Sequence, residues 1–431
     1  MITFCTTGDF LIHIPVPEGH AGAAALSEKI KTADVRITNL ETTVSNYECH
    51  ASTFSGGTGM SASPALLEDV KRFGFQACGC ANNHALDFSF GGLLATMRYL
   101  DEAGLLRAGI GGSLQEASAP ATIETPAGKV AYIAQTAVYY GNDSGRAGDS
   151  HDGIPPRPGV NGLRHIDESL VTAEQMAYIR ALAEETMVNA EEDLDRAFGY
   201  HSEENPETFT FGTVKFRLAE KTGKFSRCNE KDMQRTERGI REAKKTHDYV
   251  VTSIHSHQFR ARLEHEVDYY VEEFAHRCID AGADAVIGTG NHLLKGIEIY
   301  KGKPIFYCLG NFLFHPEYVK RLSADVMDSL GFPQELTGEE AVRRRKARAT
   351  SSMESNPIFY LSMVPFWTMD GDKLTEIKLL PVELGIREPA GLRGFPTPVA
   401  PEAIFDHLQM CCEPYGTKLA IDGEYIKVIL S

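Results

Sequence analysis

The chain has 431 residues, of which 42% are hydrophobic and 24% charged, a balance that is typical of globular proteins and excludes disorder throughout. Its formal net charge of −16 argues against a general nucleic-acid binder, because such proteins usually present a basic surface. The length is that of one large domain with an insertion, or of two domains.

Short apolar runs alternate with amphipathic stretches over the first 135 residues. We expect strands at 1–10, 35–41, 75–83 and 127–140, and helices at 23–34, 63–74 and 90–104. The second of these helices has Ser63 as its N-cap, Pro64 at its first position and Gly74 after its end. Strands that alternate with helices at this spacing predict a layered α/β architecture.

The alternation is interrupted at about residues 139–232, which we interpret as an insertion into a single domain spanning 1–385. A loop rich in Gly, Pro and Asp comes first and is longer than an ordinary connection. A helix is expected next, at 172–198, because Thr172 and Gln175 form a capping-box signature at its start.

The α/β alternation then returns and continues to the C-terminus. Helix–strand pairs are expected at 234–257 and 267–292, a strand at 302–314, and a hairpin at 359–384. The run RRRKAR at 343–348 is interpreted as an exposed helical face. Residues 386–431 are expected to form a C-terminal extension, a helix and a strand packed on the same domain.

The sequence also bears on the compartment of the protein. No apolar run reaches the roughly 18–20 residues that a membrane-spanning helix requires, and no signal peptide is visible. Nine cysteines lie scattered in apolar segments, without the spacing of a structural zinc site. We therefore expect a cytoplasmic protein with reduced thiols, and the sequence leaves its oligomeric state open.

Polar side chains recur where the predicted strands end. Carboxyl ends of strands line the ligand crevice in layered α/β folds, so we expect these side chains to lie close together. Carboxylate, amide and imidazole groups together suit a divalent ion such as Zn²⁺, Mn²⁺ or Fe²⁺. The residues concerned are Asp9, Asn39, Glu41, Asn83, His84, His255, His257, Asn291, His292 and Asn311.

Each of these residues also has a structural interpretation. An aspartate that follows a glycine, such as Asp9, is most often a turn residue, and His84 taken alone resembles a residue that begins a helix. Turn chemistry gives no reason for ligand-type side chains to recur at five strand ends, which favours a metal site. If the strand before His255 stays extended, His255 and His257 point to one face and reach one ion.

Several stretches of the chain resemble the CapA-type poly-γ-glutamate capsule-synthesis proteins, a branch of the calcineurin-like metallophosphoesterase superfamily. The matching stretches are TTGDF, ITNLETTVS, ANNHALDFSFGGLLATMRYLDEAGLLRAGIGGSLQEA, GADAVIGTGNHLLKGIEIYKGKPIFYCLGNFLF and LTEIKLLPVEL. They cover roughly residues 2–135 and 245–385, and the pair formed by ANNHALD and GKPIFYCLGNFLF is the most specific.

The resemblance implies a four-layer fold, with two sheets face to face, helices outside and one or two divalent ions at the strand ends. His84 and Asp87 are assigned as catalytic residues, His84 as the group that protonates the leaving atom. The family's last metal motif usually reads Gly-His-His-Pro-His, whereas residues 288–292 read GTGNH, and His257 is assigned as a replacement ligand. The implied metal ligands are Asp9, Glu41, Asn83, His255, His257 and His292.

The expected substrate is anionic, either a small molecule or a polyglutamate-type chain. Arg157 and Arg164 lie in the loop of the insertion and would recognise carboxylate or phosphate, although a loop arginine is more often simply solvated. Asn39 and Asn311 are further candidates for substrate binding. We expect a metal-dependent hydrolase of γ-glutamyl amides; the alternatives are a phosphoesterase and a non-catalytic polyglutamate-binding or capsule-biosynthesis accessory protein.

Overall fold

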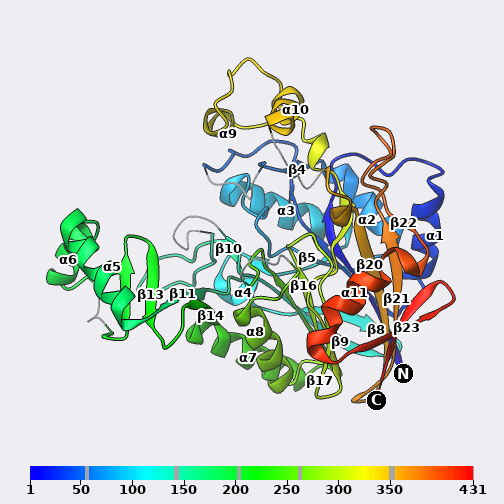
Figure 1. Ribbon diagram of the computed structural model, residues 1–431. Coiled ribbons are helices and arrows are strands. Elements are labelled where there is room, and N and C mark those ends of the chain that lie inside the picture. The colour runs from blue at the N-terminus through cyan, green and yellow to red at the C-terminus, as the bar shows by residue number, and fades with distance from the viewer. Residues whose placement is uncertain (54–57, 140–144, 201–204, 261–264, 349–354, 431) are drawn as a thin grey trace.

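Two β-sheets packed face to face form the centre of the molecule, as the computed structural model shows (Figure 1). The structure describes residues 1–430 apart from 54–57, 140–144, 201–204, 261–264 and 349–354. The first sheet has the strand order β23-β24-β21-β20-β1-β2-β5-β6, with β19 beside β1 and β22 beside β21. The second sheet has the order β17-β18-β16-β15-β9-β8.

The strands expected at 1–10, 35–41 and 127–140 are β1, β2 and β9, but the single strand expected at 302–314 is two strands, β18 in the second sheet and β19 in the first. The extended run is broken before β19 by Gly310, whose backbone is left-handed with φ of 73°. The first sheet comprises β1 (Ile2–Leu11), β2 (Val35–Leu40), β5 (Ala77–Gly79), β6 (Leu106–Ala108), β19 (Asn311–Phe314), β20 (Leu361–Asp370), β21 (Lys373–Glu383), β22 (Thr397–Pro398), β23 (Lys418–Asp422) and β24 (Tyr425–Ile429). The second comprises β8 (Ala121–Thr125), β9 (Gly128–Thr136), β15 (Tyr249–His255), β16 (Ala285–Thr289), β17 (Ile297–Tyr300) and β18 (Lys303–Phe306). The hairpin expected at 359–384 is β20–β21.

Helices cover the outer face of each sheet. One apolar cluster joins the first sheet to α1 (Ala21–Ile30), α2 (Leu67–Phe73) and α3 (Ser89–Ala103). Another joins the second sheet to α7 (Glu230–Lys244) and α8 (Tyr269–Asp280). A third cluster fills the space between the two sheets, and this confirms the expected α/β fold with four layers.

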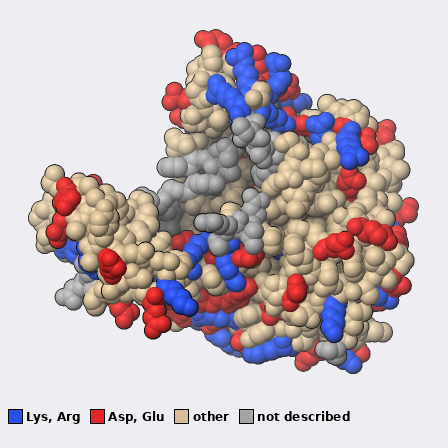
Figure 2. Space-filling view, viewed as in Figure 1, with Lys and Arg blue, Asp and Glu red and all other residues tan. Residues whose placement is uncertain are grey.

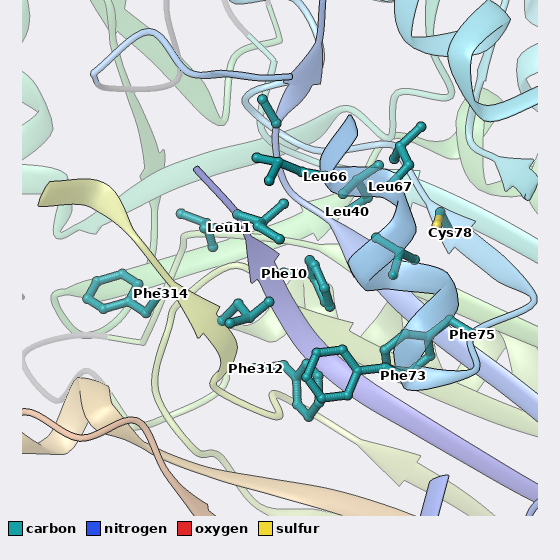
Figure 3. Packing of buried hydrophobic residues seen from close by; sticks show 14 of the residues in the cluster. Phe10, Leu11, Leu40, Leu66, Leu67, Phe73, Phe75, Cys78, Phe312 and Phe314 are labelled. Atoms are coloured by element: carbon teal, nitrogen blue, oxygen red, sulfur yellow. The ribbon is translucent and has the colours of Figure 1, made fainter. Parts of the chain in front are cut away.

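Aromatic side chains hold the layers together. Trp367 on β20 stacks on Phe4 of β1 at 4.9 Å between ring centroids, and lies 5.4 Å from Phe306 of the second sheet. On the outer face of the first sheet, edge-to-face contacts join phenylalanines from β1, α2, the segment after α2, and β19 (Figure 3). These four are Phe10, Phe73, Phe75 and Phe312. The stack of Phe4 on Trp367 and the group of four phenylalanines each include a residue of β1, so both hold in place the strand that carries Asp9.

Residues 165–200 and 205–228 form an arm that projects from the body, at the left of Figure 1. The arm contains a four-stranded sheet that the sequence did not predict, in the order β12-β13-β11-β14. Its strands are β11 (His165–Val171), β12 (Thr208–Phe211), β13 (Val214–Leu218) and β14 (Gly223–Cys228). The division into a domain over 1–385 with an insertion at about 139–232 stays a proposal.

The single helix expected at 172–198 is two helices. The capping box of Thr172 and Gln175 is present and starts α5 (Ala173–Thr186), as expected. The chain then turns at Met187, which has a left-handed backbone with φ of 53°, and resumes as α6 (Ala190–Ala197). Asn189 stabilises the break, because its amide donates to the carbonyl of Thr210 and accepts from the N–H of Gly212.

The C-terminal residues complete the first sheet, since β24 pairs with β21 and β23 with β24. The helix α11 (Phe405–Cys412) packs its buried side chains into the cluster between the sheets. The RRRKAR run lies in α10 (Gly338–Arg348), and Figure 2 shows basic side chains gathered on that lobe. In the part of the chain that the structure describes, no helix is both long and apolar enough to cross a membrane.

Gly8 allows two backbones to approach closely beside the candidate site. A Cβ at this position would lie 1.9 Å from the carbonyl oxygen of Gly310, the same oxygen that accepts the N–H of Asp9 at 3.0 Å. We expect Gly8→Ala to lower the free energy of unfolding by about 2 kcal/mol, because the backbone must shift to relieve the overlap. Chemical denaturation followed by circular dichroism measures this change.

Gly239, inside α7, is the matched control. A Cβ there would meet no atom within 4 Å, so Gly239→Ala adds only helix propensity. We expect it to leave the stability unchanged or to raise it by roughly 0.5–1 kcal/mol. If the two glycine variants change stability in the same direction and by the same amount, close backbone approach is not the reason for Gly8.

Candidate metal centre

Parallel strands bring the predicted site residues to one edge of the fold. β1 runs parallel to β2 and β19, and this register pairs Asp9 with Asn39 on one side and with Asn311 on the other. In the second sheet β15 runs parallel to β16, which pairs His255 with Thr289. Because the sheets pack face to face, the carboxyl ends of both meet at the same place.

Asp9 lies at the centre of this edge and is fully buried. Its Oδ1 accepts a hydrogen bond from the Asn39 amide at 2.8 Å, and its Oδ2 accepts the N–H of Gly290 at 3.1 Å. Two imidazoles are close by, with the Nδ1 of His292 at 3.2 Å from Oδ2 and the Nδ1 of His255 at 3.8 Å from Oδ1. The carboxylate from the first sheet thus faces histidines from the second.

Glu41 is a buried carboxylate surrounded by imidazoles. Neither of its oxygens has a hydrogen-bond partner among the described residues. Its Oε1 instead lies 3.6 Å from the Nε2 of His255, 3.8 Å from that of His292 and 4.0 Å from that of His84. Burial, and then the charge of Asp9, raises the pKa of Glu41 well above its usual range.

This environment fits a cation. An unsatisfied buried carboxylate is costly, and a metal ion supplies the missing charge and the missing partners. Two groups of three side chains have ligand atoms that all lie within 4.8 Å of one another. One group is Asp9, Glu41 and His255, and the other is Glu41, His257 and His292. Glu41 belongs to both groups.

His255 and His257 favour their neutral form, the form that binds metals. Burial, followed by the neighbouring imidazoles, lowers the pKa of both His255 and His257 well below the usual range. The strand β15 ends at His255, so His257 lies beyond it and the extended i, i+2 geometry does not apply. The turn still brings the two Nε2 atoms to 3.3 Å from each other.

The turn that follows β5 carries Asn83, His84 and Asp87. The Oδ1 of Asn83 lies 2.7 Å from the Nε2 of His255, within the group of predicted ligands. The Nδ1 of His84 lies 2.6 Å from Asp87, whose Oδ2 also accepts the N–H of Met60. His84 does not begin a helix, because α3 starts only at Ser89.

Three residues that support the site were not among the predicted functional residues. Asn82 holds the turn, because its amide donates to the carbonyl of Leu40 and accepts the N–H of His84. Thr289 places its hydroxyl 3.0 Å from the Nδ1 of His255, and the N–H of Gly290 reaches Asp9. Asn82 could have been predicted from the sequence, because it belongs to the polar run NNH. The contact of Gly290 is made by its backbone, so nothing in the sequence indicates it.

Asn39 and Asn311, which were predicted to bind substrate, form contacts with other residues of the site. Asn39 joins Asp9 to His255, with its amide nitrogen 3.3 Å from the Nδ1 of that histidine. Asn311 is buried, lies 2.8 Å from the Nδ1 of His292 and donates to the carbonyl of Phe359. Both amides therefore orient predicted ligands in this structure, and substrate contact by either stays a prediction.

Arg157 and Arg164 lie outside this group of ligands. Arg157 is exposed, and its Nε donates to the carbonyl of Arg146. Arg164 binds Asp232 with its side chain and its backbone N–H, and the side chains of Arg146 and Arg235 reach the same carboxylate. Asp232 thus organises a cluster of arginines that the sequence did not predict. Substrate binding by Arg157 and Arg164 stays a prediction.

Asp232 is expected to stabilise the fold in a pH-dependent way. Burial alone would raise its pKa, but hydrogen bonds from Arg164 and the charge of Arg235 lower it from the usual 3.8 to about 2. A carboxyl with a lowered pKa stabilises the folded state above its unfolded pKa, and this stabilisation is lost as the pH falls through the folded value. We expect Asp232→Asn to cost about 2 kcal/mol at pH 7.

Urea denaturation of the wild type and Asp232→Asn at pH 7, 5 and 3 measures this difference. It should stay constant between pH 7 and 5 and shrink at pH 3, because the wild-type advantage disappears between about pH 4 and pH 2. Asp372→Asn is the control, since that side chain is 95% exposed and should show no change at any pH. A difference that does not depend on pH would rule out the charge of Asp232 as its source.

The chain is similar in sequence to one protein family and to several known proteins. The family model described as "Bacterial capsule synthesis protein PGA_cap" matches residues 3–316. The uncharacterized protein y4sH of Sinorhizobium fredii is 31% identical over 435 residues, covering 97% of this chain and 91% of that protein. The PGA biosynthesis protein CapA of Bacillus subtilis is 41% identical over 75 residues, covering 17% of this chain and 19% of that protein.

A solved structure, that of a hypothetical protein from Thermus thermophilus, aligns with 89% of this chain and 99% of its own. The TM-score of this alignment is 0.41 and the sequence identity is 12%. The family match extends over most of the chain and includes the strand ends that carry Asp9, Glu41, Asn83, His255 and His292. The chain therefore belongs to the bacterial capsule synthesis protein PGA_cap family.

Proposed function

We propose that this protein is a metal-dependent hydrolase whose centre lies at the joined strand ends of the two sheets. The observation that carries the proposal is Glu41, a fully buried carboxylate that lies within 4 Å of three imidazoles and has no hydrogen-bond partner among the described residues. Asp9, Glu41 and His255 would hold one divalent ion. Glu41, His257 and His292 would hold a second, and Asn83 would add an amide oxygen.

A divalent ion held by these residues would supply Lewis acidity, which would polarise the attacked group and make water a stronger nucleophile. The chain's own residues supply the proton transfer. His84 points its Nε2 toward Glu41, while Asp87 holds its Nδ1 and stabilises the protonated imidazole. When the bond to the leaving atom breaks, His84 gives that atom a proton, and the proton released by the attacking water restores it.

The proposed substrate is a γ-glutamyl amide. Support comes from the relatives, because the Bacillus subtilis protein is named for PGA biosynthesis and the family for capsule synthesis. Hydrolysis would join the oxygen of water to the carbonyl carbon, break the carbon–nitrogen bond and leave a protonated amine. A phosphoester is the second candidate, since the carboxylate, amide and imidazole groups of the site suit phosphoryl transfer equally well.

The first experiment is the metal content of the purified protein by mass spectrometry. We expect one to two equivalents of Mn, Fe or Zn, and γ-glutamyl peptides and phosphoesters should then be assayed on the loaded and the chelated protein. Activity that survives full chelation contradicts the proposed mechanism. A protein that neither contains metal nor takes it up is better described as a non-catalytic accessory protein that binds polyglutamate.

A further inference from the structure

A cavity of about 340 Å³ adjoins the candidate metal centre. Its wall includes Asn82 and Asn83, in the turn between β5 and α3. Asn83 also lies 2.7 Å from the Nε2 of His255, so this cavity and the predicted ligands share a residue. A group bound in the cavity therefore lies beside the reacting bond, which makes the cavity a candidate for substrate specificity.

Most of the exposed surface of the cavity is apolar, although His50 and several hydroxyl and amide side chains also line it. Leu86, Phe90 and Tyr139 contribute large side chains, and Phe90 is 39% exposed although it is aromatic. No Lys or Arg occurs among the described residues that line the cavity. A carboxylate placed there would lose its hydration without gaining a Lys or Arg partner from the described lining, whereas an apolar group would gain from leaving water beside Leu86, Phe90 and Tyr139.

The position of the cavity indicates which part of the substrate enters it. Leu86, which lines the cavity, belongs to the same turn as His84, and Ser89, the first residue of α3, lines the cavity as well. His84 is the residue that would protonate the leaving nitrogen, and Asn83 and Leu86 on either side of it in the chain line the cavity, so we assign the cavity to the leaving amine rather than to the glutamyl group.

We propose that this cavity binds an uncharged, apolar or aromatic group on the amine that leaves, so that the substrate is a γ-glutamyl amide of an apolar amine and not an interior bond of polyglutamate. This inference rests on the proposed hydrolase function. It changes the expected substrate, because the leaving unit of polyglutamate carries a carboxylate side chain and the described lining of the cavity holds no Lys or Arg to pair with it.

Two matched substrates test the inference on the metal-loaded protein. γ-Glutamyl-phenylalaninamide and γ-glutamyl-glutamate α-amide have the same scissile bond and differ in one side chain, a phenyl group against a carboxylate. We expect kcat/KM to be at least about tenfold higher for the phenyl compound. Equal or faster cleavage of the glutamate compound would overturn the inference and leave the hydrolase function intact.

Phe90→Ala tests the cavity itself. We expect this variant to lower kcat/KM for the phenyl compound by about tenfold and to leave the glutamate compound unchanged. Phe198→Ala is the matched control, because Phe198 is 68% exposed, follows α6 in the arm and does not line the cavity. A loss of equal size for both substrates in Phe90→Ala would show that the residue supports the fold and not the specificity.

A binding measurement separates this inference from the proposed function. Ligand-observed NMR on the chelated protein, with N-acetylphenylalaninamide and N-acetylglutamate α-amide as probes, detects occupancy of the cavity without turnover. We expect the phenyl probe alone to bind, and Phe90→Ala to weaken it. If neither peptide is cleaved but this pattern holds, the hydrolase function fails and the apolar site stands; if the phenyl probe does not bind, the apolar site is wrong.

Discussion

Replacing Glu41 by glutamine is expected to remove the metal from the site and, at the same time, to stabilise the metal-free protein. Glu41 belongs to both groups of candidate ligands, so its loss should weaken metal binding by at least about 100-fold. Without metal, however, its buried carboxylate lies next to Asp9 and accepts no hydrogen bond from the described residues. A neutral amide of the same shape should raise the free energy of unfolding by about 2 kcal/mol.

Metal analysis and urea denaturation after chelation measure the two effects separately. The pKa of Glu41 is raised, so its carboxylate destabilises the folded state only above the usual value of 4.5, and the gain from Glu41→Gln should grow as the pH rises. Glu124→Gln is the control, because Glu124 is exposed on β8. If Glu41→Gln keeps its metal, or is less stable than the chelated wild type, Glu41 is a structural residue and not a ligand.

His84→Ala is expected to keep the metal and to lower turnover by about 10²–10⁴-fold. His84 is absent from both groups of candidate ligands found in the described residues, while its Nε2 lies 4.0 Å from Glu41 and its Nδ1 contacts Asp87. Loss of the proton donor should therefore reduce kcat without releasing the ion. Steady-state kinetics gives kcat, and metal analysis of the same preparation shows whether the ion is retained.

Two further variants test whether the loss of turnover comes from the His84 side chain itself. Asp87→Asn should reduce kcat less than His84→Ala does, because it weakens the support of the imidazole and leaves the proton donor in place. His151→Ala should change nothing, since that histidine is exposed. Should His84→Ala lose its metal along with its activity, His84 is a ligand; unchanged activity would place the proton donor elsewhere.

The sequence predicted the candidate site better than the details of the fold. Side chains at the carboxyl ends of parallel strands generally lie at one edge of a sheet. From this alone the sequence predicted that Asp9 of the first sheet lies close to His255 of the second, as it does. The closeness of His257 was expected for another reason, an extended strand, whereas β15 ends at His255 and a turn brings the rings together. Such a turn depends on tertiary contacts that periodicity does not record.

The contacts that the sequence did not predict join residues that are far apart along the chain. Arg164 suggested an anion-binding loop, but its partner Asp232 comes 68 residues later and lies in a different element. Met187 lies within a helical pattern, and the break there depends on contacts of Asn189 with a hairpin that begins at Thr208. The polar residues of the candidate metal centre were easier to predict, because most of them lie at or near the end of a strand; Asn311 is an exception, since it begins β19.

The order of the strands has a consequence for synthesis on the ribosome. β1 is the first strand to emerge, and β2 can pair with one of its edges soon afterwards. The other edge pairs with β19 and β20, which begin only at residues 311 and 361. At typical translation rates a nascent chain therefore carries an open, hydrophobic strand edge for on the order of tens of seconds. Truncated chains that end before β19 would keep this edge and tend to aggregate, and Asn311, which holds His292 in place, is among the last of the site residues to be made.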